Sequence, residues 1–162
     1  ITKYQGPVYM RTSRAPFPVI TQDSDPFEIG KANILRKGND VTLIGCGLMV
    51  SESLQAAEIL KKEGIAARVI NMHTIKPIDV QAIESAARDT GAIVTAEEHQ
   101  MFGGLGSAVA EVLAQTHPCP QEFVAVQDTF GESGTPAELL KKYGLKDVNI
   151  AEAARKAIKR KK

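Results

Sequence analysis

The sequence has 162 residues, of which 43% are hydrophobic and 24% charged, a balance that is typical of one globular domain and excludes a disordered chain. Its 20 basic and 19 acidic residues give a net charge of +1, which excludes a generally basic nucleic-acid binder, and no uncharged run reaches the ~18 residues of a membrane span. Its two cysteines, Cys46 and Cys119, lack CxxC spacing, which excludes a disulfide scaffold and a cysteine-based zinc site.

The first 26 residues differ from the rest, because they hold four prolines and show little helical periodicity. We predict a strand over residues 6–13 and an extended linker over residues 15–26. Two arginines, Arg11 and Arg14, stand in this stiff segment. A guanidinium so placed suits a phosphate dianion, which it binds through two parallel hydrogen bonds. The alternative is an exposed salt bridge, and composition does not decide between the two.

Four short and almost continuously apolar runs follow, at residues 41–45, 67–72, 92–96 and 123–127. Such runs are typical of strands that are covered on both faces, as in parallel sheets. A further strand is expected within residues 30–38. It would turn back through a hairpin onto the next strand and add an antiparallel edge to the sheet.

Each of the four apolar runs is followed by a segment with helical periodicity, and a fifth helix closes the chain. In the second helix, Val80 and Ile83 are expected on the buried face. The helix boundaries are predicted from capping residues. They are Gly64 at the end of the first helix, Asp79 and Gly91 at the two ends of the second, residues 105–115 for the third, and capping boxes at residues 135–138 and 149–152 for the fourth and fifth.

This alternation of strands and helices predicts an α/β fold. We expect a three-layer α/β/α arrangement around a mostly parallel sheet of about five strands, with one antiparallel edge strand. The last eight residues carry six basic side chains and no acid. They fit a solvated helix end, where cations face the negative end of the helix dipole, better than a site for RNA or phosphate.

Gly45-Cys46-Gly47 follows a predicted strand and opens a helix, which is where a dinucleotide-binding loop would lie. The third glycine of that fingerprint is replaced by Val50, so a tight turn is the better interpretation. Cys46 lies near a helix N-terminus, which stabilises a thiolate. No neighbouring base is implied by the spacing, and we favour a small buried thiol.

Glu97-Glu98-His99 lies just beyond the third apolar run, where parallel sheets place their functional crevices. Glu97 and His99 point to the same side of an extended segment. Without further ligands they make a poor metal site, so a structural or interface role is favoured over acid–base work. Gly103 and Gly104 then open the third helix, whose free N–H groups suit a phosphate or a carboxylate. Close backbone packing is favoured because the P-loop lysine is absent.

Several blocks, in this order, resemble the C-terminal domain of transketolases. They are residues 40–50, 67–72, 74–79, 96–100 and 103–107. The resemblance implies that residues 21–162 form this domain and that residues 1–20 are the tail and linker of the preceding pyrimidine-binding domain. Residues 6–14 are most similar to the short transketolases of bacteria and archaea that are often encoded as two polypeptides.

The resemblance implies transfer of two-carbon ketol units between sugar phosphates, with thiamine diphosphate and Mg²⁺. The Gly-Asp-Gly motif that binds this cofactor is missing from the sequence, as is the domain that carries the catalytic glutamate. We therefore expect the chain to bind no cofactor or metal by itself, to hold no catalytic residue and to be inactive alone. The expected partners are the cofactor-binding and pyrimidine-binding domains or an N-terminal subunit, within a homodimeric, cytoplasmic enzyme, with neither nucleic acid nor membrane.

One family residue has a match here. The family carries a Ser-Arg pair, often followed by Gln, whose arginine contacts the substrate phosphate. Ser13-Arg14 resembles this pair, although Ala15 departs from the Gln. Arg14 is therefore the candidate residue for binding the substrate phosphate.

The remaining candidates concern assembly with the other domains. They are Glu97, His99, Gly103 and Gly104. Two alternatives stay open at this point. One is the equivalent domain of 1-deoxy-D-xylulose-5-phosphate synthase, and the other is a stand-alone regulatory or nucleotide-binding module, because a fold does not determine a function.

Overall fold

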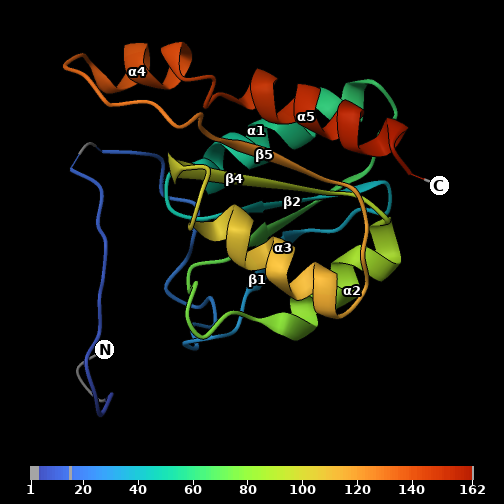
Figure 1. Ribbon diagram of the computed structural model, residues 1–162, viewed down its shortest axis with the longest axis horizontal. Coiled ribbons are helices and arrows are strands. Elements are labelled where there is room, and N and C mark those ends of the chain that lie inside the picture. Colours follow the sequence, from blue (N-terminus) through green and yellow to red (C-terminus); the bar gives the residue numbers. More distant parts are fainter. Residues whose placement is uncertain (1–3, 15, 162) are drawn as a thin grey trace.

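Five strands form one sheet in the computed structural model, which describes residues 4–14 and 16–161. Their order across the sheet is β1-β3-β2-β4-β5 (Figure 1). The strands are β1 (Asn33–Arg36), β2 (Val41–Gly45), β3 (Ala67–Asn71), β4 (Ile93–Gln100) and β5 (Gln121–Val126). β2 to β5 run parallel, and β1 pairs antiparallel with β3 at one edge. The predicted α/β fold with an antiparallel edge strand is confirmed.

The predicted hairpin between the first two strands is wrong. β1 pairs with β3 and not with its neighbour in sequence, β2. The reason is that β2 lies in the centre of the sheet, where β3 and β4 occupy both of its edges. The edge of β3 is therefore the one that β1 covers.

Helices cover both faces of the sheet. α1 (Met49–Lys62) and α5 (Asp147–Lys159) pack on one face, and α2 (Val80–Thr90) and α3 (Leu105–Gln115) pack on the other (Figure 1). The short α4 (Pro136–Lys142) contains no buried residue. Among the described residues, no helix is both long and apolar enough to cross a membrane.

Neighbouring residues of the central strands face opposite helix layers. In β2, Leu43 packs with the side chains of α1 and α5, whereas Ile44 packs with those of α2 and α3. Both side chains are fully buried. This explains why both faces of the strand carry apolar residues rather than only one, because each face is covered by helices.

The predicted helix ends are confirmed at most positions. The Asp79 carboxylate accepts the Ala82 N–H at 3.0 Å at the start of α2, and Gly91 ends this helix in a left-handed conformation. Val80 is 43% exposed, contrary to expectation. The inner face of α2 is set by Ile83 and by the residues one helical turn along from it, and Val80 lies beside that face.

The fifth helix begins earlier than predicted. α5 starts at Asp147, and Asn149 lies inside its first turn, where its Oδ1 accepts the Lys146 N–H at 3.2 Å. The start is set by a residue distant in sequence. The buried Glu52 carboxylate accepts the Asp147 N–H at 2.9 Å and pairs with Lys146 Nζ at 2.6 Å. A negative charge at this position favours the N-terminus of a helix.

The predicted strand at residues 6–13 is not present. Residues 4–14 are extended and exposed, without a strand (Figure 1). A strand needs a ladder partner, and no described strand pairs with this segment. Ala15, where the predicted linker begins, lies outside the described residues.

Candidate functional site at the carboxyl edge of the sheet

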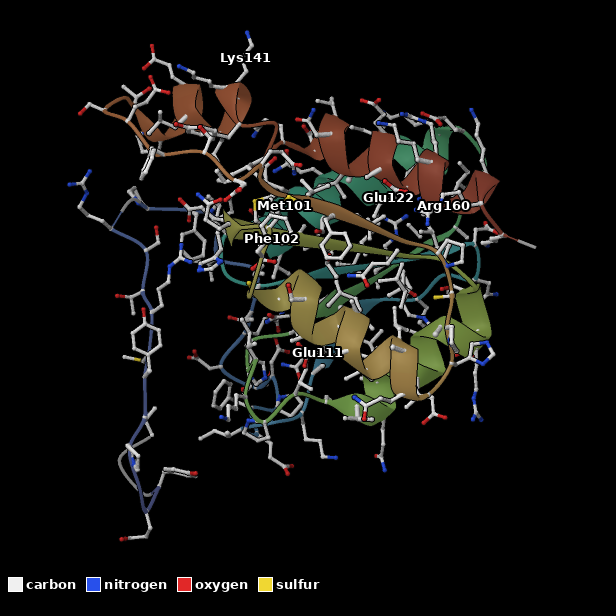
Figure 2. All side chains as sticks on the ribbon, in the orientation of Figure 1. Met101, Phe102, Glu111, Glu122, Lys141 and Arg160 are labelled. Atoms are coloured by element: carbon white, nitrogen blue, oxygen red, sulfur yellow. The ribbon has the colours of Figure 1, made fainter. Side chains whose placement is uncertain are left out.

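The four parallel strands end at the same edge of the sheet. We use the name carboxyl edge for the part of it at the ends of β2, β4 and β5, which consists of residues 45–47, 97–107 and 127–130. β4 extends beyond β2 here, because Gly45 pairs with Ala96 and β4 continues to Gln100. Figure 2 shows Met101 and Phe102, which follow β4 at this edge. In open α/β sheets, ligands usually bind in the crevice outside the carboxyl ends of the strands.

Glu97 is buried at this edge and binds the start of α3. One carboxylate oxygen, Oε2, accepts the Leu105 N–H, and the other, Oε1, accepts the Gly106 N–H, both at 2.8 Å. The carboxylate therefore lies at the positive end of the helix dipole. The sequence predicted free N–H groups here that suit a phosphate or a carboxylate, and the structure fills them with the chain's own carboxylate.

Gly104 is needed for this contact. A Cβ at this position would lie 2.0 Å from Glu97 Oε2 and 2.9 Å from His99 Nδ1, which no real side chain tolerates. The preceding Gly103 is exposed and has a φ of +75°. The close backbone packing that the sequence favoured for this loop is thus observed at Gly104 itself.

His99 lies on the same side of β4 as Glu97, as its spacing predicts. The distance between His99 Nδ1 and Glu97 Oε2 is 3.8 Å, and the histidine side chain is 48% exposed, against 3% for Glu97. The structure therefore brings the four candidate interface residues together. Of these, His99 and Gly103 are exposed, and their role in an interface stays a prediction.

Cys46 is a neutral thiol in this site. Burial raises the pKa of Cys46 to about 11, and the nearby Glu97 charge adds to this effect. Because the thiolate is the reactive form of cysteine, a thiol of this kind is not a nucleophile at neutral pH. The sequence favoured a small buried thiol, and the structure places Cys46 in a partly buried position.

We call residues 1–20 the leading segment. Its two arginines, Arg11 and Arg14, differ in their surroundings. Arg11 Nη2 donates to the Glu98 carbonyl at 2.7 Å and lies 3.5 Å from a Glu98 carboxylate oxygen. Both side chains are about half exposed, so this contact includes the exposed salt bridge that the sequence left open. Arg14 is exposed three residues further along the segment. Its role toward a phosphate stays a prediction.

Sequence reasoning missed the part that Glu98 plays. No sequence signal identifies it, because Arg11 binds its backbone carbonyl and the two residues are 87 positions apart. The pairing of β4 with β5 shifts in register between Ala96 and Gln100. Such irregularities depend on the packing of the whole sheet edge and not on residue type.

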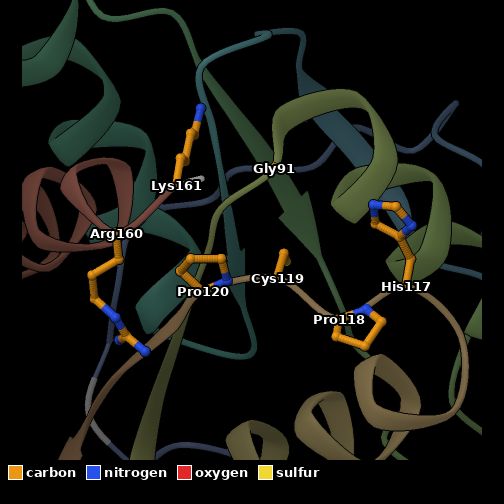
Figure 3. Close-up of a pocket in the computed structure, with 7 residues that line it drawn as sticks. All are labelled: Gly91, His117, Pro118, Cys119, Pro120, Arg160 and Lys161. Carbon is orange, nitrogen blue, oxygen red and sulfur yellow. The ribbon is translucent and has the colours of Figure 1, made fainter.

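An open hollow of about 710 Å³ lies at the opposite edge of the sheet, where Figure 3 shows the residues that line it. They are Gly91, His117, Pro118, Cys119, Pro120, Arg160 and Lys161. Both of its cationic side chains are bound within the chain. Arg160 pairs with Glu122, beside it in Figure 2, and Lys161 donates to the Asp40 carbonyl. Burial raises the pKa of Cys119, so its thiol stays neutral.

The described residues do not fit a metal-bound cofactor. Among them, no group of three or more His, Cys, Asp or Glu side chains is placed to hold a metal ion. Glu97 is bound to α3 and Glu98 to Arg11. A magnesium-bound diphosphate needs oxygen ligands that are open to the metal, and the Glu97 carboxylate is already occupied by two N–H groups of α3.

Known proteins resemble this chain over nearly all of its length. Residues 30–150 match the family model described as "Transketolase, C-terminal domain". The chain is 47% identical over 161 residues to the 6-deoxy-6-sulfo-D-fructose transketolase subunit SqwH of Clostridium sp. strain MSTE9, with coverage of 99% of this chain and 50% of that one. It is 38% identical over 157 residues to the 1-deoxy-D-xylulose-5-phosphate synthase of Heliobacterium modesticaldum, with coverage of 94% and 24%.

A solved structure has the same fold. It is described as "Split gene transketolase, inactive beta4 tetramer", and it matches with a TM-score of 0.89 and 48% sequence identity, over 92% of this chain and 49% of that chain. The chain therefore spans about half the length of SqwH and of this solved chain.

Proposed function

This chain belongs to the transketolase C-terminal domain family, and from this membership we propose that it serves as the C-terminal part of a transketolase. In that role it supports the transfer of two-carbon ketol units between sugar phosphates. The observation that carries the proposal is the match of nearly the whole chain to transketolase subunits, in sequence and in fold.

The chemistry belongs to the other part of the enzyme. Thiamine diphosphate and Mg²⁺ are held there, because this chain has no Gly-Asp-Gly motif and no fitting group of ligands among the described residues. The isolated chain is inactive. The name of the solved relative, an inactive tetramer, supports this for a protein of the same fold.

Arg14 is the residue of this chain that contacts the substrate. Its guanidinium is exposed on a segment that passes the carboxyl edge of the sheet. A guanidinium binds a phosphate dianion through two parallel, charge-assisted hydrogen bonds. The substrates are accordingly sugar phosphates.

Assembly uses the carboxyl edge. His99 and Gly103 are exposed there and contact the cofactor-binding part, while Glu97 and Gly104 shape the loop that presents them. The complete enzyme is a homodimer, whereas the solved relative of this fold is named as a tetramer. The compartment is the cytoplasm, where unpaired thiols such as Cys46 and Cys119 persist.

The test is an assay of ketol transfer with thiamine diphosphate and magnesium, with and without the polypeptide that holds the missing domains. We expect activity only from the mixture. In the active enzyme, Arg14→Ala is expected to raise KM for phosphorylated sugars by about 10- to 100-fold, the cost of losing a charged hydrogen bond. An unphosphorylated analogue keeps its KM.

Arg155→Ala is the matched control, because it removes an arginine of α5 that pairs with Glu63 at the end of α1, away from the carboxyl edge. Activity of the isolated chain, free of contaminating enzyme, would overturn the two-part proposal. An equal change of KM for both kinds of substrate would remove Arg14 from the phosphate site.

A synthase is the second candidate, because the 1-deoxy-D-xylulose-5-phosphate synthase of Heliobacterium modesticaldum shares 38% identity over 157 residues. The same two polypeptides distinguish the two when a 2-oxo acid donor and a triose phosphate acceptor are supplied beside the ketose. Formation of deoxyxylulose phosphate in place of ketol transfer favours the synthase.

A further inference from the structure

The end of β4 offers a rigid anchoring point at the carboxyl edge. β2 stops at the level of Ala96, and the pairing with β5 is irregular between Ala96 and Gln100. Glu98 lies within this interval. Its neighbour Glu97 is fixed by two hydrogen bonds to the start of α3, each of 2.8 Å. The backbone at Glu98 is therefore held in place although the regular ladder is interrupted there.

Arg11 binds this anchoring point from the leading segment. Its Nη2 atom donates to the Glu98 carbonyl at 2.7 Å, a short, charge-assisted hydrogen bond. The approach to the Glu98 carboxylate is longer, at 3.5 Å, and both side chains are about half exposed to solvent. An exposed ion pair of this kind contributes little, so the bond to the carbonyl is the main contact.

The contact fastens a segment that has no ladder of its own. Residues 4–14 are exposed and without secondary structure, and they run beside the body of the fold (Figure 1). Arg14 follows Arg11 by three residues, which is at most ~11 Å of extended chain. A bond that fixes Arg11 against the sheet therefore also limits where the Arg14 guanidinium can lie.

We propose that Arg11 is a positioning residue, which binds the Glu98 backbone carbonyl and thereby sets the place of Arg14 over the carboxyl edge. This inference rests on the proposed role of Arg14 toward the substrate phosphate. In this role Arg11 acts through Arg14 and not on the substrate itself. It reduces the conformational freedom of the segment before the substrate binds, so that binding costs less conformational entropy.

The experiment uses the complete enzyme, assembled from both polypeptides, with a phosphorylated sugar and its unphosphorylated analogue. Arg11→Gln is expected to raise KM for the phosphorylated sugar by about three- to tenfold and to leave KM for the analogue unchanged. Arg155→Gln is the matched control, since it breaks the exposed Arg155–Glu63 pair away from the carboxyl edge. It should change neither KM value.

A double variant separates positioning from direct binding. If Arg11 acts through Arg14, adding Arg11→Gln to Arg14→Ala gives no further rise of KM. An equal rise in both backgrounds, or no rise in either, overturns the proposal. If Arg14→Ala alone affects both substrates equally, the phosphate role fails and the positioning role fails with it. A selective Arg14→Ala with a silent Arg11→Gln removes only the positioning role.

Discussion

Two opposing features of its surroundings decide whether the Cys46 thiol ionises. The residue lies between a strand end and a helix start, where backbone N–H groups favour a thiolate. Burial favours the neutral thiol, and so does the negative charge of Glu97. Burial and the Glu97 charge outweigh the helix start, because the pKa of Cys46 is raised to about 11.

This raised pKa predicts a particular dependence of stability on pH. Folding holds the pKa of Cys46 at about 11, above its ordinary value of 9.0. Its contribution to stability is therefore complete below pH 9 and is lost as the pH rises through 11, because the unfolded thiol ionises first. The loss amounts to roughly 2–3 kcal/mol of the unfolding free energy.

Urea unfolding between pH 8 and pH 11 checks this prediction when the natural protein is compared with Cys46→Ala. Other groups titrate equally in both proteins, so the difference between the two curves isolates Cys46. The natural protein should lose more stability over this range. Parallel curves for the two proteins would contradict the assignment.

At the scale of elements, the start of α3 depends on a strand. The first N–H groups of a helix have no partner within it, and Glu97 of β4 binds two of them. Gly104 leaves room for the carboxylate. The strand end, the loop and the helix start are thus one unit, and this unit shapes the carboxyl edge.

Substitutions at Glu97 should therefore destabilise the isolated chain. Glu97→Gln keeps the size of the side chain but loses the charge, and we expect a loss of about 1–2 kcal/mol in unfolding free energy. Glu97→Ala leaves two buried N–H groups unpaired and should cost about 2–4 kcal/mol. Urea denaturation measures both values.

Glu111→Gln is the matched control, because Glu111 is exposed on the same helix (Figure 2). Its effect should stay within about 0.5 kcal/mol. Equal stability of Glu97→Ala and Glu111→Gln would show that the carboxylate does not support α3. The expected sensitivity also means that a variant at Glu97 is a poor test of the interface, for which the exposed His99 is better suited.

Local patterns predicted most of these elements. Apolar runs predicted the central strands, and residues such as Asp79 and Thr135 predicted where helices begin. The predictions are wrong where contacts between residues distant in the sequence determine a helix start or a strand pairing. Glu52 sets the start of α5, and the edge of β3 rather than β2 receives β1. The final residues of β4 are polar and follow no strand pattern, yet the strand continues through them.

The geometry of the carboxyl edge was predicted to the same extent, whereas the functional roles of its residues stay predictions. The spacing of Glu97 and His99 placed both on one side of β4, and the glycines indicated close packing. What the sequence did not contain was the partner of Arg11. A backbone carbonyl carries no residue-type signal, so contacts of this kind appear only in the folded chain.

At the scale of the whole molecule, the core and the leading segment are separate. The buried hydrophobic residues lie between Val41 and Ala157, on the two faces of the sheet. The described residues up to Val19 are all exposed. Arg11 contacts the body through Glu98 at the surface, whereas contacts with more buried residues begin later, where Phe27 stacks on His73 with ring centroids 4.4 Å apart and the Ala32 N–H donates to Asp79 at 2.9 Å.

This separation predicts how the chain responds to shortening. Deleting residues 1–20 should change the unfolding free energy of the isolated chain by less than about 1 kcal/mol, because an exposed contact such as that of Arg11 contributes little. Deleting residues 1–32 also removes the Phe27 stack and the Ala32 hydrogen bond, and should cost about 2–3 kcal/mol. Urea denaturation of the two shortened chains gives both values.

The comparison also tests the division of the chain at residues 20 and 21. A loss of several kcal/mol from the shorter deletion would make the leading segment part of the folded core. With the expected result, the same shortened chain still folds but lacks both Arg11 and Arg14. An enzyme assembled from it should then keep its KM for unphosphorylated sugars and lose its preference for phosphorylated ones, because the fold and the phosphate contact reside in different parts of one polypeptide.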